Sequence, residues 1–593
     1  MHSQPQYNPH NQYRQQGGNS KAMRRENQLE AVQKKEETDS NYFWTTVFRY
    51  RCKNNPPMIP TASPEELFSS VSTNVGINFD QYDAIPVTRS GPDVEDVLSL
   101  NDFSALNEVL PDFLMDNLTS PSKMGYSKPT PIQRHCIPLS IDGRYDVMAC
   151  AQTGSGKTVA FLVPMIASIA NQPFFNPVID EFNQYGYNAK TPAQPSAVVI
   201  APTRELAMQI ELEAQKLTCG SPLRCVCVYG GSPARGQLEI LARPGCEILV
   251  GTPGRLNDFL GRELISLQRV TFLCLDEADR MLDMGFEPQI REICEEYDLP
   301  RREERRTLMF SATFPDGVQK IAQHYLREYV FVAVGRVGST TDSITQKIVR
   351  VDSNDKYLKL QTLLGSVGDI NAPTPGSSTT SDNNNDNNNN SNNNNNNTVP
   401  LPLPLVLPTE KTIIFCQKKH VASWLRTELQ NSSRSLRCAD IHGDRTQAQR
   451  EQALQLFRSG FVNVLVATDV AARGLDVSDI NHVVQFDLPS GAQDFDTYVH
   501  RIGRTGRAGN VGRATSLFVP GMEAKRGENG NLWGEMVKFL KESNQVVEDW
   551  FANVSLNERN VNGNGNGNGN GYGNGGGEFG GGMGRDMRAE YAG

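Results

Sequence analysis

Short and nearly continuous apolar runs recur in two parts of this 593-residue chain, and each run ends in a polar loop. Strands that are buried on both faces of a parallel sheet have this character, with helices between them. The pattern therefore predicts an α/β fold with two domains, each a parallel sheet flanked by helices. The runs are 146–150, 197–200, 272–275 and 307–310 in the first part, and 412–415, 462–466 and 483–486 in the second.

Biased composition separates these domains from other segments of the chain. We expect the first domain at 96–337 and the second at 338–555, with a solvated Asn-rich insertion at 368–408. Polar, low-complexity sequence cannot bury a core, which predicts a largely disordered extension at 1–95 and a disordered Gly/Asn-rich tail at 556–593. Within the extension, the aromatic stretch Tyr42–Tyr50 is either a docking segment or a local helix, and docking is favoured.

The global charge and cysteine usage constrain the partners and the compartment. A net charge of −9 announces no nucleic-acid partner, so any basic groove must be local. Eleven cysteines without a CxxC pair indicate reduced thiols and no zinc, which fits a cytoplasmic protein, with the nucleus and RNA granules as further compartments. No apolar run reaches the roughly 18 residues that a membrane helix needs, so no membrane partner is expected.

A glycine-rich loop between a predicted strand and a predicted helix has the features of a phosphate-binding loop. Its glycines allow backbone N–H groups to surround a phosphate at a helix N-terminus. Lys157 can reach the β- and γ-phosphates of ATP, and the Thr158 hydroxyl can ligate Mg²⁺. The loop consists of Ala151, Gln152, Thr153, Gly154, Ser155, Gly156, Lys157 and Thr158.

Two further polar segments suit the same chemistry. Asp276 follows a predicted strand and suits Mg²⁺ held through water, which leaves Glu277 to polarise the attacking water as a general base. In the second domain, His500–Arg507 carries three arginines at intervals of three residues. These are either a solvated basic face or fingers that stabilise charge on the transferring phosphoryl group.

Together with motifs around them, these segments resemble the DEAD-box helicase family over about residues 100–555. The resemblance implies two RecA-like domains and an ATP-dependent RNA helicase that hydrolyses ATP with RNA stimulation and locally remodels RNA. The motifs are, in order, Gly125–Gln133, the phosphate loop, Pro202–Leu206, Gly230–Gly231, Thr252–Arg255, Asp276–Asp279, Ser311–Thr313, Ala467–Asp476 and His500–Arg507.

The resemblance also implies roles for single residues near ATP. Gln133, whose amide both donates and accepts, would read adenine, and Phe103 would stack on the base. Arg504 and Arg507 would be the fingers, whereas Arg501 would pair with acidic residues and His500 would link its motif to the first domain. The remaining implied positions are Tyr126 and Lys128 at the nucleotide, Asp476 near the ribose, and Ser311 and Thr313 in coupling ATP state to strand separation.

RNA is expected to lie across both domains and to favour their closure, so that RNA raises ATPase activity and ATP tightens RNA binding. Such contacts reach sugar and phosphate and carry no sequence information. The expected RNA-binding residues are Pro202, Thr203, Arg204, Gly230, Gly231, Thr252, Gly254, Arg255, Gln447, Arg450, Thr468 and Gly474.

Two upstream segments, Glu65–Phe68 and Gly76–Pro86, resemble a narrower branch that contains Vasa and the helicases of translation initiation. This implies action on mRNA during initiation, with initiation factors as partners through the N-terminal extension. A non-enzymatic RNA clamp and a DNA-directed motor are the alternative hypotheses. ATPase assays with and without RNA or single-stranded DNA separate the three.

Overall fold

The computed structural model describes residues 10–51, 59–69, 85–152, 154–170, 172, 191–335, 344–365, 410–432, 436–469, 480–489, 491, 495–506, 511–523 and 527–554. Side chains of the first helix are described from residue 27 onward. Among the helices of these segments, none is long and apolar enough to cross a membrane.

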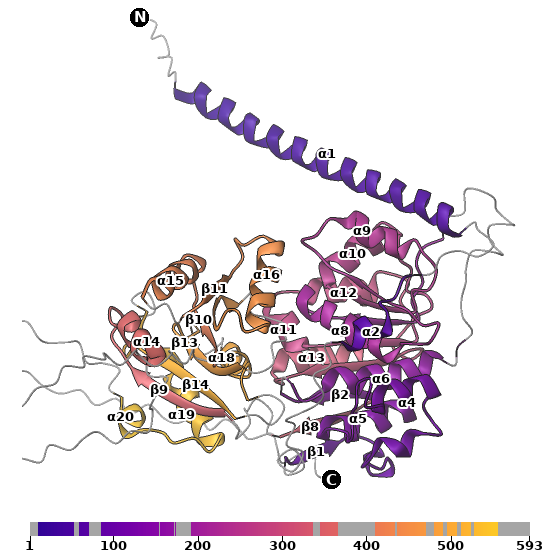
Figure 1. The fold of residues 1–593 in the computed structure, drawn as a ribbon. Helices are drawn as coiled ribbons and strands as arrows, with labels where there is room; N and C mark the ends of the chain where they lie inside the picture. The colour runs from indigo at the N-terminus through magenta and orange to yellow at the C-terminus, as the bar shows by residue number, and fades with distance from the viewer. Residues whose placement is uncertain are drawn as a thin grey trace, which may run out of the picture.

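The first domain is built on an eight-stranded sheet with the order β1-β8-β2-β7-β6-β3-β5-β4 (Figure 1). All described pairings in it are parallel except that of β1 with β8. The strands are β1 Val87–Ser90, β2 Asp146–Cys150, β3 Ala197–Ile200, β4 Cys225–Val228, β5 Ile248–Gly251, β6 Phe272–Leu275, β7 Arg306–Ser311 and β8 Tyr329–Val334.

Helices cover both faces of this sheet, and successive strand residues belong to different cores. Val147 and Ala149 pack into the core under α4, α5, α6 and α8, whereas Met148 packs into the core under α9 to α13. This alternation follows from the period of two along a strand. The helices are α4 Asp112–Thr119, α5 Pro131–Asp142, α6 Lys157–Ala170, α8 Arg204–Leu217, α9 Ala234–Leu241, α10 Pro253–Gly261, α11 Ala278–Asp283, α12 Glu287–Glu295 and α13 Asp316–Tyr325.

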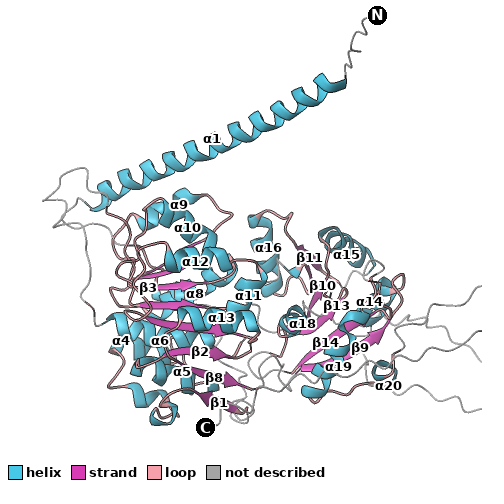
Figure 2. Cartoon of the chain, turned by 180° about the vertical axis from the view of Figure 1, so that it is seen from behind, coloured by secondary structure: helices cyan, strands magenta, loops and turns pink. Residues whose placement is uncertain are grey.

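The second domain has a six-stranded sheet with the order β11-β12-β10-β13-β14-β9, and its described pairings are all parallel (Figure 2). Helices α14 and α15 cover one face, and α16, α18, α19 and α20 cover the other. The strands are β9 Ile344–Arg350, β10 Lys411–Phe415, β11 Cys438–Ile441, β12 Val464–Ala467, β13 Ile480–Gln485 and β14 Gly512–Phe518. The helices are α14 Lys356–Gly365, α15 Lys419–Ser432, α16 Gln447–Arg458, α18 Phe495–Ile502, α19 Trp533–Glu542 and α20 Asp549–Ala552.

The predicted fold class of two α/β domains with parallel sheets is confirmed. Every apolar run predicted as a strand is one, with ends shifted by at most a few residues. The first domain, however, begins earlier in the chain than residue 96, because β1 joins its sheet as an antiparallel edge strand. The Asn-rich insertion at 368–408 and the tail from 556 lie outside the described residues.

The N-terminal extension contains two further described helices, α1 (His10–Arg51) and α2 (Pro64–Phe68). The aromatic stretch Tyr42–Tyr50 lies at the carboxyl end of α1 and packs on the first domain, so the two interpretations of it both hold. The amino-terminal part of α1 projects beyond the domain (Figure 1).

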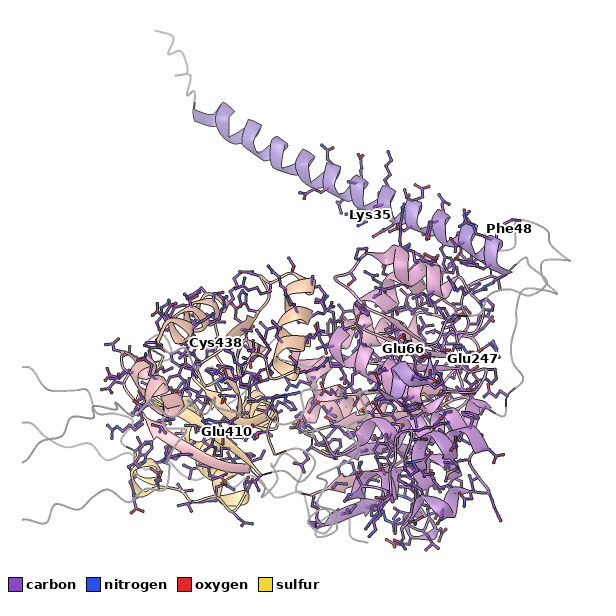
Figure 3. All side chains as sticks on the ribbon, in the orientation of Figure 1. Lys35, Phe48, Glu66, Glu247, Glu410 and Cys438 are labelled. Atoms are coloured by element: carbon purple, nitrogen blue, oxygen red, sulfur yellow. The ribbon has the colours of Figure 1, made fainter. Side chains whose placement is uncertain are left out.

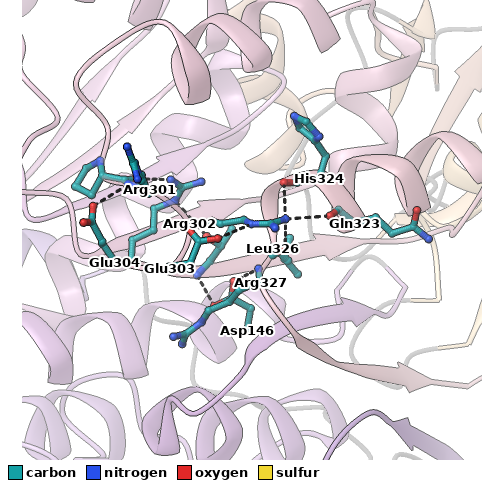
Figure 4. Close-up of polar contacts among 12 residues, drawn as sticks. Asp146, Arg301, Arg302, Glu303, Glu304, Gln323, His324, Leu326 and Arg327 are labelled. Carbon is teal, nitrogen blue, oxygen red and sulfur yellow. Dashed lines mark hydrogen bonds and ion pairs between the residues drawn. The ribbon is translucent and has the colours of Figure 1, made fainter.

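At the amino ends of the first sheet's strands, a polar network joins loops to helix ends (Figure 4). Asp146 is fully buried and accepts hydrogen bonds from the backbone N–H groups of Thr307 and Arg327, and from the Arg327 guanidinium at 3.1 Å. Arg302 donates to the carbonyl oxygens of Gln323, His324 and Leu326 at the end of α13. A cation at the carboxyl end of α13 complements the helix dipole and stabilises this edge of the sheet. The loops of the candidate site lie at the opposite edge.

Candidate functional site

Apart from Gly125–Gln133, which leads into α5, the predicted motifs of the first domain follow the carboxyl ends of its strands, where open α/β sheets bind ligands. The sheet order divides them into two groups. The phosphate loop, Asp276–Asp279 and Ser311–Thr313 follow the neighbouring strands β2, β6 and β7, and we call this group the nucleotide half. Pro202–Leu206, Gly230–Gly231 and Thr252–Arg255 follow β3, β4 and β5, and we call this group the RNA half.

The phosphate loop has the conformation that its glycines predict. Gly154 and Gly156 have φ angles of 81° and 91°, in the region that favours glycine. A Cβ atom on Gly156 would lie 2.5 Å from Nε2 of Gln133, so only glycine allows the α5 amide to approach this closely. Thr153 of the loop lies outside the described residues.

Gln133 holds the loop through both ends of its amide. Nε2 donates to the Gly156 carbonyl at 3.1 Å, and Oε1 accepts from the Thr130 N–H at 3.0 Å. The Thr130 hydroxyl donates to the Ser155 carbonyl at 2.8 Å. Thr130 and Gln133 form a capping box at the start of α5, a role that the Thr-x-x-Gln pattern could have predicted. The adenine-reading role of Gln133 stays a prediction.

Lys157 begins α6 and is buried, with 8% of the residue's surface exposed. Its ammonium donates to the Ala151 carbonyl at 2.8 Å and lies 3.5 Å from the Ser311 carbonyl oxygen. Phosphate oxygens at the loop would add charged acceptors to these two neutral carbonyls.

The acidic residues after β6 are unusual in both backbone and electrostatics. Burial raises the pKa of Asp276 to about 7, against the lowering effect of Lys157. Glu277 has a φ of 50°, which is strained for a residue with a side chain, and its Oε2 is buried without a hydrogen-bond partner. The buried hydroxyls of Ser155 and Ser311 are likewise unpartnered. Unpaired buried polar atoms that converge on one loop indicate a bound polar ligand.

Asp279 connects the two domains, a role that the sequence analysis missed. Its Oδ2 accepts from the N–H groups of Ala312 and Thr313 and from the Thr313 hydroxyl at 2.9–3.1 Å, and lies 3.3 Å from Nε2 of His500. Burial lowers the pKa of His500 to about 4, so its imidazole is neutral at pH 7. Burial alone would raise the pKa of Asp279, but His500, Lys157 and Arg280 together hold it below its usual range. His500 thus contacts the first domain as predicted.

The arginines of the second domain occupy different environments. Arg501 pairs with both carboxylate oxygens of Asp469 at 2.5 and 2.7 Å, as predicted. Helix α18 ends at Ile502, so Arg504 lies beyond it and not on its face. The Arg504 guanidinium is buried and its Nε donates to the His500 carbonyl at 3.2 Å, which places it beside the contact with Asp279. Arg507, Asp476 and Gly474 lie outside the described residues.

The expectation that Phe103 stacks on adenine is contradicted. Phe103 is only 1% exposed and belongs to the core between α4, α5 and the sheet, so its ring offers no free face to a base. Tyr126 is half-buried against the same core, and Lys128 is exposed.

Helix N-termini and glycines form the RNA half. Thr203 caps α8 by accepting from the Leu206 N–H, and the hydroxyl of Thr252, before α10, accepts from the Gly230 N–H at 3.3 Å. Gly231 has a φ of 77°, and Gly254 is exposed at the start of α10. Arg255 donates to the Ser232 carbonyl at 2.9 Å. Backbone N–H groups at such helix starts suit phosphate.

Across from the RNA half, the second domain presents α16 and the end of β12. Arg450 of α16 forms an ion pair of 2.9 Å with Glu205 of α8, and Glu205 is also 3.4 Å from Arg204. Oε1 of Gln447 and Nε of Arg450 are buried without hydrogen-bond partners, and Thr468 is buried after β12. Glu205 was not predicted as a site residue, although it stands within the motif Pro202–Leu206.

A phosphate-binding loop, buried carboxylates at neighbouring strand tips, and contacts from a second parallel-sheet domain define a two-domain RecA-like ATPase. A family model described as DEAD/DEAH box helicase matches residues 130–321, and a model of the helicase conserved C-terminal domain matches residues 400–509. The chain belongs to the DEAD-box helicase family and is an ATP-hydrolysing RNA helicase.

This chain is also similar to solved structures of proteins bound to RNA. S. cerevisiae Dbp5 bound to RNA and ADP BeF3 is 25% identical with a TM-score of 0.55, over 76% of this chain and 95% of that chain. Mss116p bound to ssRNA and AMP-PNP is 25% identical with a TM-score of 0.56, over 76% of this chain and 78% of that chain.

Proposed function

We propose that this helicase uses ATP binding and hydrolysis to unwind short duplexes in mRNA, and that it does so during translation initiation in the cytoplasm. The observation that carries the RNA-remodelling mechanism is that both halves of one sheet edge are contacted by the second domain. His500 reaches Asp279 in the nucleotide half, and Arg450 reaches Glu205 in the RNA half. Ligands at either half therefore act on the same domain closure.

Within the nucleotide half, the loop would bind the ATP phosphates and Lys157 would balance their charge. Thr158 and Asp276 would hold Mg²⁺, which fits because a hydroxyl of the phosphate loop and a buried carboxylate follow β2 and β6 at the same sheet edge. The ion would shield the phosphate charge when bound. The unpartnered Oε2 of Glu277 is available to accept a proton from the attacking water.

Arg504 and Arg507 would supply positive charge from the second domain, so that hydrolysis requires closure. Thr313 shares Asp279 with His500, and Ser311 ends the strand beside the phosphate loop. This arrangement supports a coupling role for both hydroxyl residues. The RNA half, with Gln447, Arg450 and Thr468 opposite, would bind the sugar–phosphate backbone of a single strand.

The initiation role rests on the segments that resemble the narrower branch. The described one, Glu65–Phe68, forms α2, in which Ser63 and Glu66 make a capping box and Leu67 is buried. Initiation factors bound through the N-terminal extension are the proposed partners. Crosslinking the protein to RNA in cells and sequencing the fragments tests this role. Fragments concentrated in mRNA 5′ leaders support it, and fragments dominated by ribosomal or spliceosomal RNA precursors contradict it.

A further inference from the structure

Residues 39–51 of α1 pack on α9 and form what we call the docked segment. Phe43 and Val47 are 0% and 6% exposed and belong to the core that covers one face of the first sheet. Before this segment, side chains from Asn27 to Thr38 are exposed. Figure 3 shows the difference, with Lys35 on the projecting part of α1 and Phe48 at the end beside the domain. Burial on this scale stabilises a specific position of the helix.

Polar contacts hold α9 at its start and middle. Asp39 pairs with Arg235 in the first turn of α9 at 3.3 Å, and Arg235 lies 5.4 Å from the ring of Tyr42. The hydroxyls of Tyr50 and Tyr42 donate to Glu239 at 3.1 and 3.4 Å.

Arg51 holds the other end of α9. It is 4% exposed, and its guanidinium donates to the carbonyl oxygens of Leu241 and Ala242 at 3.2 and 3.1 Å and to that of Thr191 at 2.9 Å. The first two carbonyls end α9, where the helix dipole favours a cation. Because the charge is buried, the pKa of Arg51 falls to about 10. A buried guanidinium that pairs with carbonyls persists only if the surrounding geometry is fixed.

Helix α9 in turn fixes the loop that contains Gly230 and Gly231. Gln237 of α9 accepts from the Tyr229 N–H and donates to the Tyr229 carbonyl, both at 3.1 Å, immediately before the loop. Its Oε1 also accepts from Arg255 at 3.3 Å. The loop is therefore set by the position of α9 relative to β4 and α10.

We propose that the docked segment is a positioning element for RNA binding: by holding α9, it sets the loop at Gly230–Gly231 and so the affinity for single-stranded RNA. Arg51 is its central residue. The inference rests on the proposed RNA contacts of this loop, and it assigns to the N-terminal extension a function within the helicase core.

The test is the full chain with Arg51→Gln. We expect its Kd for single-stranded RNA, measured by fluorescence anisotropy with a non-hydrolysable ATP analogue, to rise about 5- to 20-fold, within the usual range of coupling between sites. The KM for RNA in ATPase assays should rise in parallel. The kcat at saturating RNA and the ATPase rate without RNA should stay unchanged. Lys35→Gln, on the exposed part of the same helix, is the matched control and should alter nothing.

Hydrogen exchange of α9 shows whether the variant loosens this helix. Faster exchange in α9 with unchanged RNA affinity overturns the proposal. If Arg51→Gln does not fold, Asp39→Asn replaces it, because this variant weakens the contact at the opposite end of α9. The same RNA-binding and exchange measurements then test the proposal. Gly230→Glu separates the two levels of the argument, because a side chain fits there and its charge would repel phosphate. If both variants bind RNA normally, the proposed RNA contact of the loop is wrong. If Gly230→Glu weakens RNA binding but Arg51→Gln does not, the positioning role of the docked segment is wrong.

Discussion

The nucleotide half and the RNA half share one sheet edge, yet the second domain contacts them by different chemistry. At the nucleotide half, a neutral imidazole meets a carboxylate, and the His500 and Asp279 side chains are each 2% exposed. At the RNA half, the Arg450–Glu205 ion pair joins two full charges whose side chains are 12% and 10% exposed. A buried contact with one neutral partner depends on close fit, whereas an ion pair at a partly wet surface can exchange its carboxylate for a phosphate. The two contacts therefore differ in how far each relies on fit and on charge.

Among the variants that compare the two halves, the largest effect is expected from Glu277→Gln in the nucleotide half. Removing the general base should lower RNA-stimulated kcat by roughly 10²–10⁴-fold. Binding of ATP and RNA should persist, because the amide keeps the size of the side chain. Steady-state ATPase and anisotropy assays on the same preparation measure both. Normal turnover in this variant would remove the role of the base.

A smaller loss is expected from Asp279→Asn, which removes the negative charge from the contact with His500. An amide oxygen at the Oδ2 position can still accept from Ala312 and Thr313, but it lacks the negative charge that the carboxylate presents to them and to His500. Replacing the charged acceptor by a neutral one should cost about 1.5–3 kcal/mol in total, so RNA-stimulated kcat/KM for ATP should fall about 10- to 100-fold. The effect should change little between 50 and 300 mM salt. A strong salt dependence would contradict the comparison.

The smallest effect is expected at the ion pair. Arg450→Glu alone should weaken ATP-dependent RNA binding about 5- to 30-fold, because like charges then face each other across the domains and the RNA half loses a cation, and the loss should be larger at low salt. The double variant Glu205→Arg with Arg450→Glu restores the pair and should recover part of the affinity. A strictly additive double variant would show that the pair does not contribute to closure.

Seven of the fourteen described strands were predicted, because strands buried on both faces are continuous apolar runs, whereas β4, β5, β8, β9, β11 and β14 were not named. The sequence missed β1, whose residues Val87–Ser90 alternate in burial and pair only at the sheet edge. It also missed the docking contacts of α1 beyond Tyr42–Tyr50, since Asp39 and Arg51 gain their partners only in the folded chain.

The sequence predicted the motifs that form the candidate site, but it did not predict which of their residues pair across the two domains. Asp279 and Glu205 acquire their roles from residues more than two hundred positions away, which no local pattern encodes. The misplacement of Phe103 has a related cause: an aromatic residue upstream of a motif suits a stacking platform or a core equally, and burial decides for the core.

The central claim is that one nucleotide site is assembled from both domains, and RNA-stimulated kcat of Arg504→Ala tests it most directly. Arg504 belongs to the second domain, so binding of a fluorescent ATP analogue to the first domain should persist and serves as the control for folding. The account predicts that kcat with saturating RNA falls by at least about 10³-fold, close to the rate without RNA. RNA-stimulated turnover at the unmodified level, with nucleotide binding intact, would contradict it.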